Sequence, residues 1–152
     1  MLYTEEGSAI VNLQRHATAE MAAQFHHLFV NRRAYTVQSM RPHPETGRHY
    51  YFRPKAHEGQ PPPALGPETL RRHLAGELTL GLYSLNPKTQ RSKWVAIDAD
   101  YKNAIEHLLK LQYELTQDGV EPALEKSNRG GHLWIFFEKP ALARDCRVYI
   151  YH

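Results

Sequence analysis

Two aspartates follow a short apolar segment near the middle of the chain, at a spacing suited to metal binding. Residues 95–97 are apolar and lead into Asp98, and Asp100 comes two positions later. Strand residues two apart point to the same face of a sheet. Carboxylate oxygens are the ligands that Mg²⁺ or Mn²⁺ prefers. We therefore expect Asp98 and Asp100 to present two carboxylates to one hard cation.

A glycine-rich segment from Ser127 to His132 follows about thirty residues later and leads into a second apolar strand, residues 133–137. Gly130 and Gly131 permit φ > 0, as tight turns often require, and glycine lets backbone N–H groups come close to an anion. Ser127 and His132, at the two ends, add side-chain hydrogen-bond donors. Together with the aspartates, this segment predicts a metal-dependent site that binds nucleotide phosphates.

Both motifs also have structural interpretations, which the sequence leaves open. Asp100 is suited to be the N-cap of a helix that starts near Lys102, and residues 127–132 can be a hairpin loop with a partly buried His132. An EF-hand is excluded, because Asn103 and the helix after it break the ligand spacing. In a β-α-β-β unit, however, the strand with the aspartates and the hairpin lie in one sheet. The polar side chains of the two motifs can then converge.

The hydrophobic pattern predicts an α+β protein in two parts. Residues 1–90 are expected to form a basic α/β module, and residues 91–152 an RRM-like unit. The first part contains a helix (18–30), two strands (34–40 and 48–52), a proline-rich loop (54–67), a short helix from Pro67 and a strand (78–85). The second contains a strand (93–99), a helix (102–118), two strands (120–126 and 132–138) and a last helix that opens at Lys139-Pro140. This β-α-β-β-α order lacks the usual final strand, so we expect one domain that is truncated at its C-terminus.

Positive charge is concentrated in the first part of the chain. Residues 31–93 hold 11 Lys and Arg against four Glu, a balance of +7, whereas the flanks together carry −4. The same segment contains Tyr35, Tyr50, Tyr51, Phe52 and four His. Basic residues mixed with aromatic ones suit a polyanion that also offers bases to stack on. A solvated, loop-rich face is the structural alternative.

The remaining bulk features favour a cytoplasmic protein without a membrane partner. No apolar run approaches the ~20 residues that span a bilayer. Residues 1–6 are acidic and lack the apolar centre of a signal peptide. Cys146 is the only cysteine, which rules out an internal disulfide and fits a reducing compartment.

Two segments of the chain resemble the signature motifs of a known superfamily. Residues 96–100 and 127–137 are similar to the first and second motifs of the archaeo-eukaryotic primases. The likeness is to the primase-polymerase branch found in mobile elements, conflict systems and CRISPR-associated proteins. The order of elements from Phe25 to Tyr83 is also similar to that branch, so the likeness covers most of the chain.

This resemblance implies a role for each residue of the two motifs. Asp98 and Asp100 would hold two divalent metal ions, Mg²⁺ or Mn²⁺. Ser127 and His132, with the Gly130-Gly131 turn, would bind the phosphates of an incoming NTP or dNTP. From its position inside the loop, we infer that Arg129 assists as a positive charge.

The chain departs from the superfamily at the third motif, an apolar residue followed by an acidic one on a strand beyond the second helix. That carboxylate completes the metal site. Glu138 and Asp145 come too early to fill it, because they belong to the hairpin strand and the last helix. The resemblance thus predicts a fragment, or a shortened form, of the catalytic domain.

The function implied by the resemblance is template-directed nucleotidyl transfer in primer synthesis and DNA replication, catalysed by a DNA or RNA primase-polymerase. The partner would be a single-stranded or primed DNA or RNA template. Its phosphates would be held in the basic segment, for which the candidates are Arg48, Arg53, Arg71 and Arg72. Fusion to, or association with, helicase, nuclease or CRISPR-associated proteins is also implied.

Two other functions compete with this one. A non-catalytic, RRM-like nucleic-acid-binding module needs aromatic side chains on its sheet, and Trp134, Phe136 and Phe137 are the nearest candidates. Core packing explains that near-continuous apolar run better. A metal-dependent nicking nuclease often uses a histidine cluster. The only adjacent pair, His26-His27, lies on an expected helix where neighbouring side chains diverge.

Overall fold

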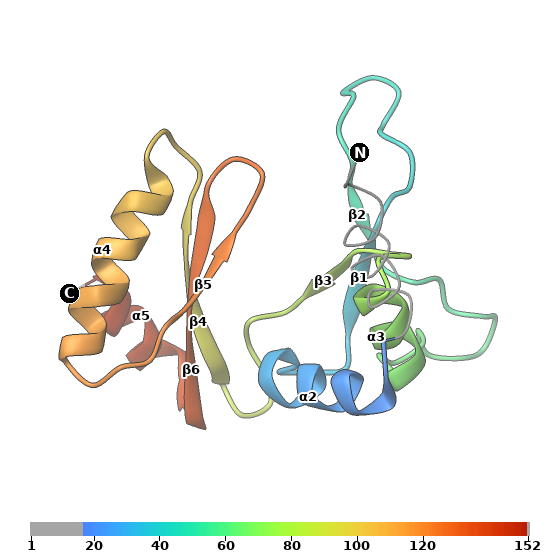
Figure 1. Ribbon diagram of the computed structural model, residues 1–152. Coiled ribbons are helices and arrows are strands. Elements are labelled where there is room, and N and C mark those ends of the chain that lie inside the picture. The colour runs from blue at the N-terminus through green and yellow to red at the C-terminus, as the bar shows by residue number, and fades with distance from the viewer. Residues whose placement is uncertain (1–16, 152) are drawn as a thin grey trace. The chain divides into compact units, whose positions relative to one another are not determined.

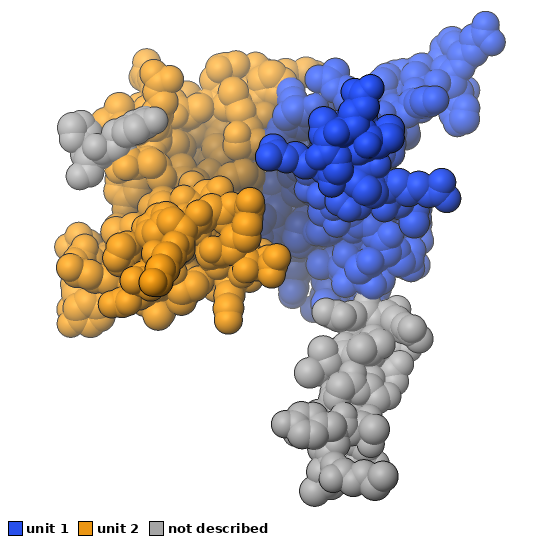
Figure 2. Space-filling model, turned by 90° about the horizontal axis from the view of Figure 1, so that it is seen from above, with its two compact units in different colours: residues 1–83 blue, residues 84–152 orange. Residues whose placement is uncertain are grey.

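The computed structural model describes residues 17–151 of the chain. These residues contain four helices and six strands, and the strands form two separate antiparallel sheets (Figure 1). The chain divides into two compact units, residues 1–83 and residues 84–152 (Figure 2). The predicted α+β class is confirmed. Over the described part of the chain, no helix has the length and apolar character needed to cross a membrane.

Unit 1 is a three-stranded sheet with two helices. Its helices are α2 (Ala19–Phe29) and α3 (Pro67–Leu74), and its strands are β1 (Tyr35–Gln38), β2 (Tyr51–Phe52) and β3 (Leu80–Leu82). The strand order is β2-β1-β3, so β2 forms one edge. Thr18 caps α2 as predicted, because its hydroxyl oxygen accepts the N–H of Met21 at 3.1 Å. The core of the unit consists of Ala22, Val30, Tyr35, Leu65, Leu70 and Leu80.

Unit 2 has the predicted β-α-β-β-α order. Its elements are β4 (Arg91–Ala99), α4 (Ala104–Gln117), β5 (Ala123–Lys126), β6 (Gly131–Leu142) and α5 (Ala143–Tyr151). The strand order is β4-β6-β5, with both helices on one face of the sheet (Figure 1). That face buries Val95, Ala99, Leu133 and Ile135. Side chains alternate along a strand, so the residues between these positions point to the opposite face.

The last helix begins later than predicted. We expected it to open at Lys139, but β6 continues through Pro140 to Leu142. A register shift on β4 lets Arg91 pair with Leu142, and the Arg91 guanidinium donates to the carbonyl of Pro140 at 2.8 Å. Proline is tolerated here because β5 pairs with β6 only as far as Trp134, so one side of the strand needs no ladder hydrogen bond.

The three aromatic residues of the apolar run lie on both faces of the sheet. Phe137 packs against the buried cluster under α5, as expected. Trp134 and Phe136 alternate with the buried Leu133 and Ile135 and therefore lie on the sheet face opposite the helices. There the ring centroids of Trp134 and Phe136 lie 6.2 Å apart. The apolar run is near-continuous because both of its faces carry apolar side chains.

Asp100 does not cap α4. The N-cap position is occupied by Asn103, which has a left-handed backbone (φ 66°) and makes no side-chain capping bond. Residues 101–103 therefore separate Asp100 from the helix. Its carboxylate is left for other contacts.

Candidate functional site

The register of the second sheet places three polar side chains in a row across its open face. Asp98 on β4 pairs with His132 on β6, and His132 pairs on its other side with Glu125 on β5. The Nε2 atom of His132 lies 3.3 Å from an Asp98 carboxylate oxygen, and Nδ1 lies 3.1 Å from Glu125 Oε2. The imidazole is therefore held between two carboxylates from the neighbouring strands.

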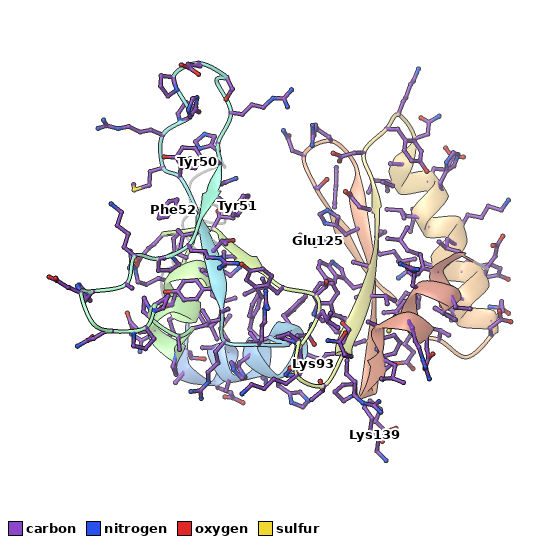
Figure 3. The ribbon with its side chains drawn as sticks, turned by 180° about the vertical axis from the view of Figure 1, so that it is seen from behind. Tyr50, Tyr51, Phe52, Lys93, Glu125 and Lys139 are labelled. Carbon is purple, nitrogen blue, oxygen red and sulfur yellow. The ribbon has the colours of Figure 1, made fainter. Side chains whose placement is uncertain are left out.

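Glu125 is a member of this row that sequence reasoning missed. Its carboxylate accepts hydrogen bonds from Nδ1 of His132 and, at 2.8 Å, from the indole Nε1 of Trp134. Figure 3 shows Glu125 on β5, the outer strand of the hairpin. The available signal was the alternation of β5, which turns Leu124 toward the helices and Glu125 away from them. The register across β5 and β6 was needed to place it beside His132.

The loop between β5 and β6 is closed by Ser127. The backbone N–H of Ser127 donates to the Gly130 carbonyl at 2.9 Å, and the N–H of Gly130 donates to the Ser127 hydroxyl oxygen at 3.2 Å. The Gly130 amide is thus engaged within the loop, contrary to the bare N–H expected there. Since the Ser127 hydroxyl acts as an acceptor in this bond, its own O–H remains a donor to a ligand.

The two glycines are required by close packing and not by a left-handed backbone. Neither Gly130 nor Gly131 has a positive φ, so the turn-based expectation is wrong. A Cβ on Gly130 would overlap the carbonyl oxygen of Ala99 at the end of β4. A Cβ on Gly131 would lie 2.6 Å from the Glu125 carbonyl oxygen and 2.7 Å from Ile105 Cδ1. The glycines let the loop approach the strand that carries the aspartates.

Asp100 is linked to the same loop through Arg129. The Arg129 guanidinium forms an ion pair with the Asp100 carboxylate. The Arg129 side chain is 79% exposed and that of Asp100 36%, so the pair is screened by water and contributes at most about 1 kcal/mol. Asp98 and Asp100 thus contact different members of the loop, His132 and Arg129, at one end of the sheet.

The two carboxylates suit a cation whose remaining coordination positions are filled by water and by phosphate oxygens of a substrate. Among residues 17–151, no three His, Cys, Asp or Glu side chains are grouped to hold a metal ion. Mg²⁺ commonly takes one or two carboxylates, waters and substrate phosphates instead of an all-protein cage. Asp98, 65% exposed, and Asp100 supply carboxylates of this kind next to the Ser127–His132 loop.

The four arginines suggested for nucleic acid lie in unit 1, away from the acidic residues in sequence. Arg71 forms an ion pair with Glu68 at 2.8 Å, and Arg72 pairs with Glu77 at 3.0 Å. The positive charges of Arg71 and Arg72 are therefore partly neutralised by glutamates of unit 1. Arg48 and Arg53 flank β2 and are exposed.

Two resolved pKa shifts lie outside the site. Burial raises the pKa of the Cys146 thiol above its ordinary value; a backbone hydrogen bond opposes this shift and the charge of Asp145 adds to it. Burial also lowers the pKa of Lys93 on β4. The thiol lies in the core with Val95 and Ile135, so it has a packing role.

Unit 2 thus has an RRM-like order of elements, with two carboxylates at the end of its first strand and a Ser–His loop beside them. The family model described as "TOTE conflict system, Archaeo-Eukaryotic Primase domain" matches residues 22–152. The chain belongs to this family, as its two motifs predicted. A search of curated proteins found no match.

Proposed function

We propose that this chain is the nucleotide-binding part of a primase-polymerase that transfers nucleotides to a nucleic-acid 3′-hydroxyl. The observation that carries the proposal is the pairing of Asp98 with His132. It puts a carboxylate suited to bind a metal ion next to a side chain suited to bind phosphate. Membership of the family supports this reading of the pair. The substrate class is an NTP or dNTP, the partner is a DNA or RNA template, and the compartment is the cytoplasm.

In this reaction the 3′-hydroxyl oxygen forms a bond with the α-phosphorus, the bond between the α-phosphorus and the bridging oxygen to the β-phosphate breaks, and pyrophosphate and a proton leave. The Ser127 hydroxyl donates a hydrogen bond to a phosphate oxygen. Because Glu125 accepts the proton on Nδ1, the His132 ring donates to the phosphates from Nε2 as an imidazolium. The exposed Arg129 guanidinium adds positive charge at the same loop. Glu125 is a positioning residue, because it holds Nδ1 of His132 and orients the ring, whose Nε2 lies 3.3 Å from Asp98.

Asp98 and Asp100 would hold Mg²⁺ or Mn²⁺, which when bound supplies positive charge for the attacking hydroxyl and the departing pyrophosphate. The protein's own contribution is to keep the two carboxylates against the loop. The Gly130 contact with Ala99 fixes the loop on the end of β4. A triphosphate bound there is aligned with the strand from which the carboxylates project.

Calorimetric titration of the chain with a non-hydrolysable nucleoside triphosphate, in the presence of Mn²⁺, tests the proposal. Loss of one hydrogen bond to a charged group costs about 1.5–3 kcal/mol, so His132→Ala should weaken binding about 10- to 150-fold. Asp98→Asn should abolish the dependence of triphosphate binding on Mn²⁺. Equal affinity in the parent protein and both variants would contradict the proposal.

Two matched variants serve as controls. His57→Ala removes an exposed histidine of unit 1, and Asp118→Asn removes an exposed carboxylate after α4. Both should bind the triphosphate like the parent. Primer extension with labelled nucleotides then separates transfer from binding, and metal-dependent cutting of a single strand without nucleotide would indicate a nuclease instead.

A second function is favoured by the aromatic side chains on the face of the unit 2 sheet opposite the helices. Trp94 contacts Trp134 at 5.1 Å, and Trp134 stacks with Phe136 at 6.2 Å, in line with His132. RRM-like sheets bind RNA by stacking bases on such rings. As a non-catalytic module, the protein would bind oligonucleotides in a manner sensitive to Trp134→Leu but indifferent to Asp98→Asn and His132→Ala.

A further inference from the structure

Three neighbouring aromatic side chains in unit 1 lie at the surface on and beside an edge strand. Tyr50, Tyr51 and Phe52 are 50%, 49% and 43% exposed. They precede or form β2, which, within residues 17–151, pairs with β1 on one side only. Figure 3 shows the three side chains along this strand. Exposed large aromatic residues that lie next to one another, unlike single ones, mark interaction surfaces.

The rings form a continuous row on one side of the hairpin. Tyr50 lies 6.2 Å from His43 in an edge-to-face contact, and 6.2 Å from Phe52 in a tilted contact. Three contacts with Ser39 hold the loop. The Ser39 N–H donates to the Tyr50 carbonyl at 2.8 Å, the Tyr50 N–H donates to the Ser39 hydroxyl oxygen at 3.1 Å, and His49 Nδ1 contacts the Ser39 carbonyl at 2.7 Å. The rings are thus presented by an ordered turn and need little rearrangement on binding.

A groove continues this row along the sheet edge. It has a volume of about 510 Å³ and is lined by Phe52 together with Val37, Met40, His49, Pro54 and Arg72, among others. Polar side chains of Gln38, Ser39 and Thr79 also face it. Apolar side chains with scattered hydrogen-bonding groups accommodate a flat heterocycle, and the Arg72–Glu77 ion pair also lines the groove.

The charge around the rings is positive. Residues 40–57 contain four Arg or Lys against one Glu, and three His besides. Arg48 and Arg53 flank the row on either side and are exposed. A polyanion is the partner that such a surface attracts, and the adjacent rings select a polyanion with unpaired, flat bases.

We propose that the surface formed by His43, Tyr50, Phe52, Arg48 and Arg53 binds single-stranded nucleic acid. Bases stack on Tyr50 and Phe52, one base enters the neighbouring groove, and the two arginines contact the flanking phosphates. Recognition is by stacking and charge, so it tolerates any sequence. The surface lies wholly in unit 1 and uses no residue of the acidic site, so it does not require nucleotide transfer to occur.

Fluorescence anisotropy with a labelled 12-nucleotide single strand, without metal or nucleotide, tests this proposal. The double variant Tyr50→Leu/Phe52→Leu keeps apolar side chains but removes the rings. Base–ring stacking is worth about 1–3 kcal/mol per base, so binding should weaken about 5- to 150-fold or more. Tyr50→Trp should retain binding. Tyr113→Leu, which changes an aromatic residue 66% exposed on α4, is the matched control and should bind like the parent.

The salt dependence tests the arginines separately. Each phosphate contact contributes about 0.7 to the slope of log affinity against log salt for a single strand. Arg48→Ala/Arg53→Ala should reduce that slope by about 1.4. Lys110→Ala, an exposed cation of α4, should leave it unchanged. A blunt duplex of equal length should bind more weakly and be indifferent to loss of the rings.

Each outcome is decisive, provided that circular dichroism shows the variants to be folded. Parent-like single-strand binding by the double leucine variant would overturn the proposal, as would equal sensitivity of single-strand and duplex binding. If the leucine variant is unfolded, Tyr50→Leu alone replaces it. Triphosphate binding measured in the same variants should be unchanged, which separates this surface from the site at Asp98 and His132.

Discussion

Glu125 and His132 face each other across the hairpin of unit 2, with Nδ1 of the imidazole 3.1 Å from Oε2 of the carboxylate. An ionised carboxylate only accepts hydrogen bonds, so the contact puts a proton on Nδ1. Trp134 donates to the same oxygen at 2.8 Å and limits the movement of the carboxylate. The orientation of His132 is therefore set by a residue on the neighbouring strand.

Glu125→Gln should change the state of His132 without unfolding the protein. The neutral amide offers a weaker acceptor to Nδ1–H, and triphosphate affinity should fall about fivefold or more, the effect of about 1 kcal/mol. Long-range ¹H–¹⁵N NMR should show a smaller share of the Nδ1-protonated tautomer. Glu114→Gln, an exposed carboxylate on α4, is the control. A purely structural role for Glu125 predicts an unchanged tautomer, and that result would refute the assignment.

Gly130→Ala and Gly131→Ala should destabilise unit 2 and displace the loop from β4. The added methyl groups meet backbone carbonyl oxygens of Ala99 and Glu125, which cannot move aside without disturbing the sheet. Overpacking of this kind costs about 1–3 kcal/mol in the free energy of unfolding, measurable by urea denaturation. Gly66→Ser places a side chain in open space at the N-cap of α3 and should be tolerated. Equal stability of all three variants would show that the loop is not packed on β4.

Arg129→Ala should have opposite effects on the two ligands. It removes a positive charge from the loop, so the triphosphate should bind more weakly. It also releases the Asp100 carboxylate from its ion pair, so Mn²⁺ alone should bind up to about fivefold more tightly, given the ~1 kcal/mol ceiling of an exposed pair. Calorimetry with each ligand separately measures both. Weaker Mn²⁺ binding in Arg129→Ala would indicate that Asp100 does not serve the cation.

The Cys146 thiol should make the protein less stable in alkaline solution. Its pKa is raised by burial in the folded state. Below about pH 8.5, the ordinary thiol value, both states are protonated and the full stability is present. As the pH rises from there through the raised folded pKa, the unfolded chain loses its proton first, so the free energy of unfolding decreases.

Urea denaturation between pH 7.5 and 9.5 checks this dependence against Cys146→Ala. The variant is expected to be less stable at every pH because it leaves a cavity, but its stability should decrease less steeply as the pH rises. Alkylation by iodoacetamide should be slow in the folded parent and fast in urea. Identical pH slopes in the two proteins would mean that the thiol does not contribute.

The sequence by itself determined the elements and the chemical types at the site. Short apolar runs indicated β4 and β6, the Thr18 cap and Pro67 indicated the starts of two helices, and the two motifs indicated the family. These features depend on local backbone preference and on side-chain spacing, which a linear sequence states directly. The last helix was placed too early, because the β4 partners that extend β6 past Pro140 are distant in the chain.

Only the tertiary structure decided what the site residues contact. Strand register placed His132 between Asp98 and Glu125, and it assigned Trp134 and Phe136 to the sheet face opposite the helices. The glycines of the loop proved to be packing residues, since the carbonyl that Gly130 accommodates lies about thirty residues earlier. Pairing and close approach between distant segments are set by the balance of many weak contacts. For that reason the sequence indicated the chemical types of the site residues, and the folded sheet determined which of them are in contact.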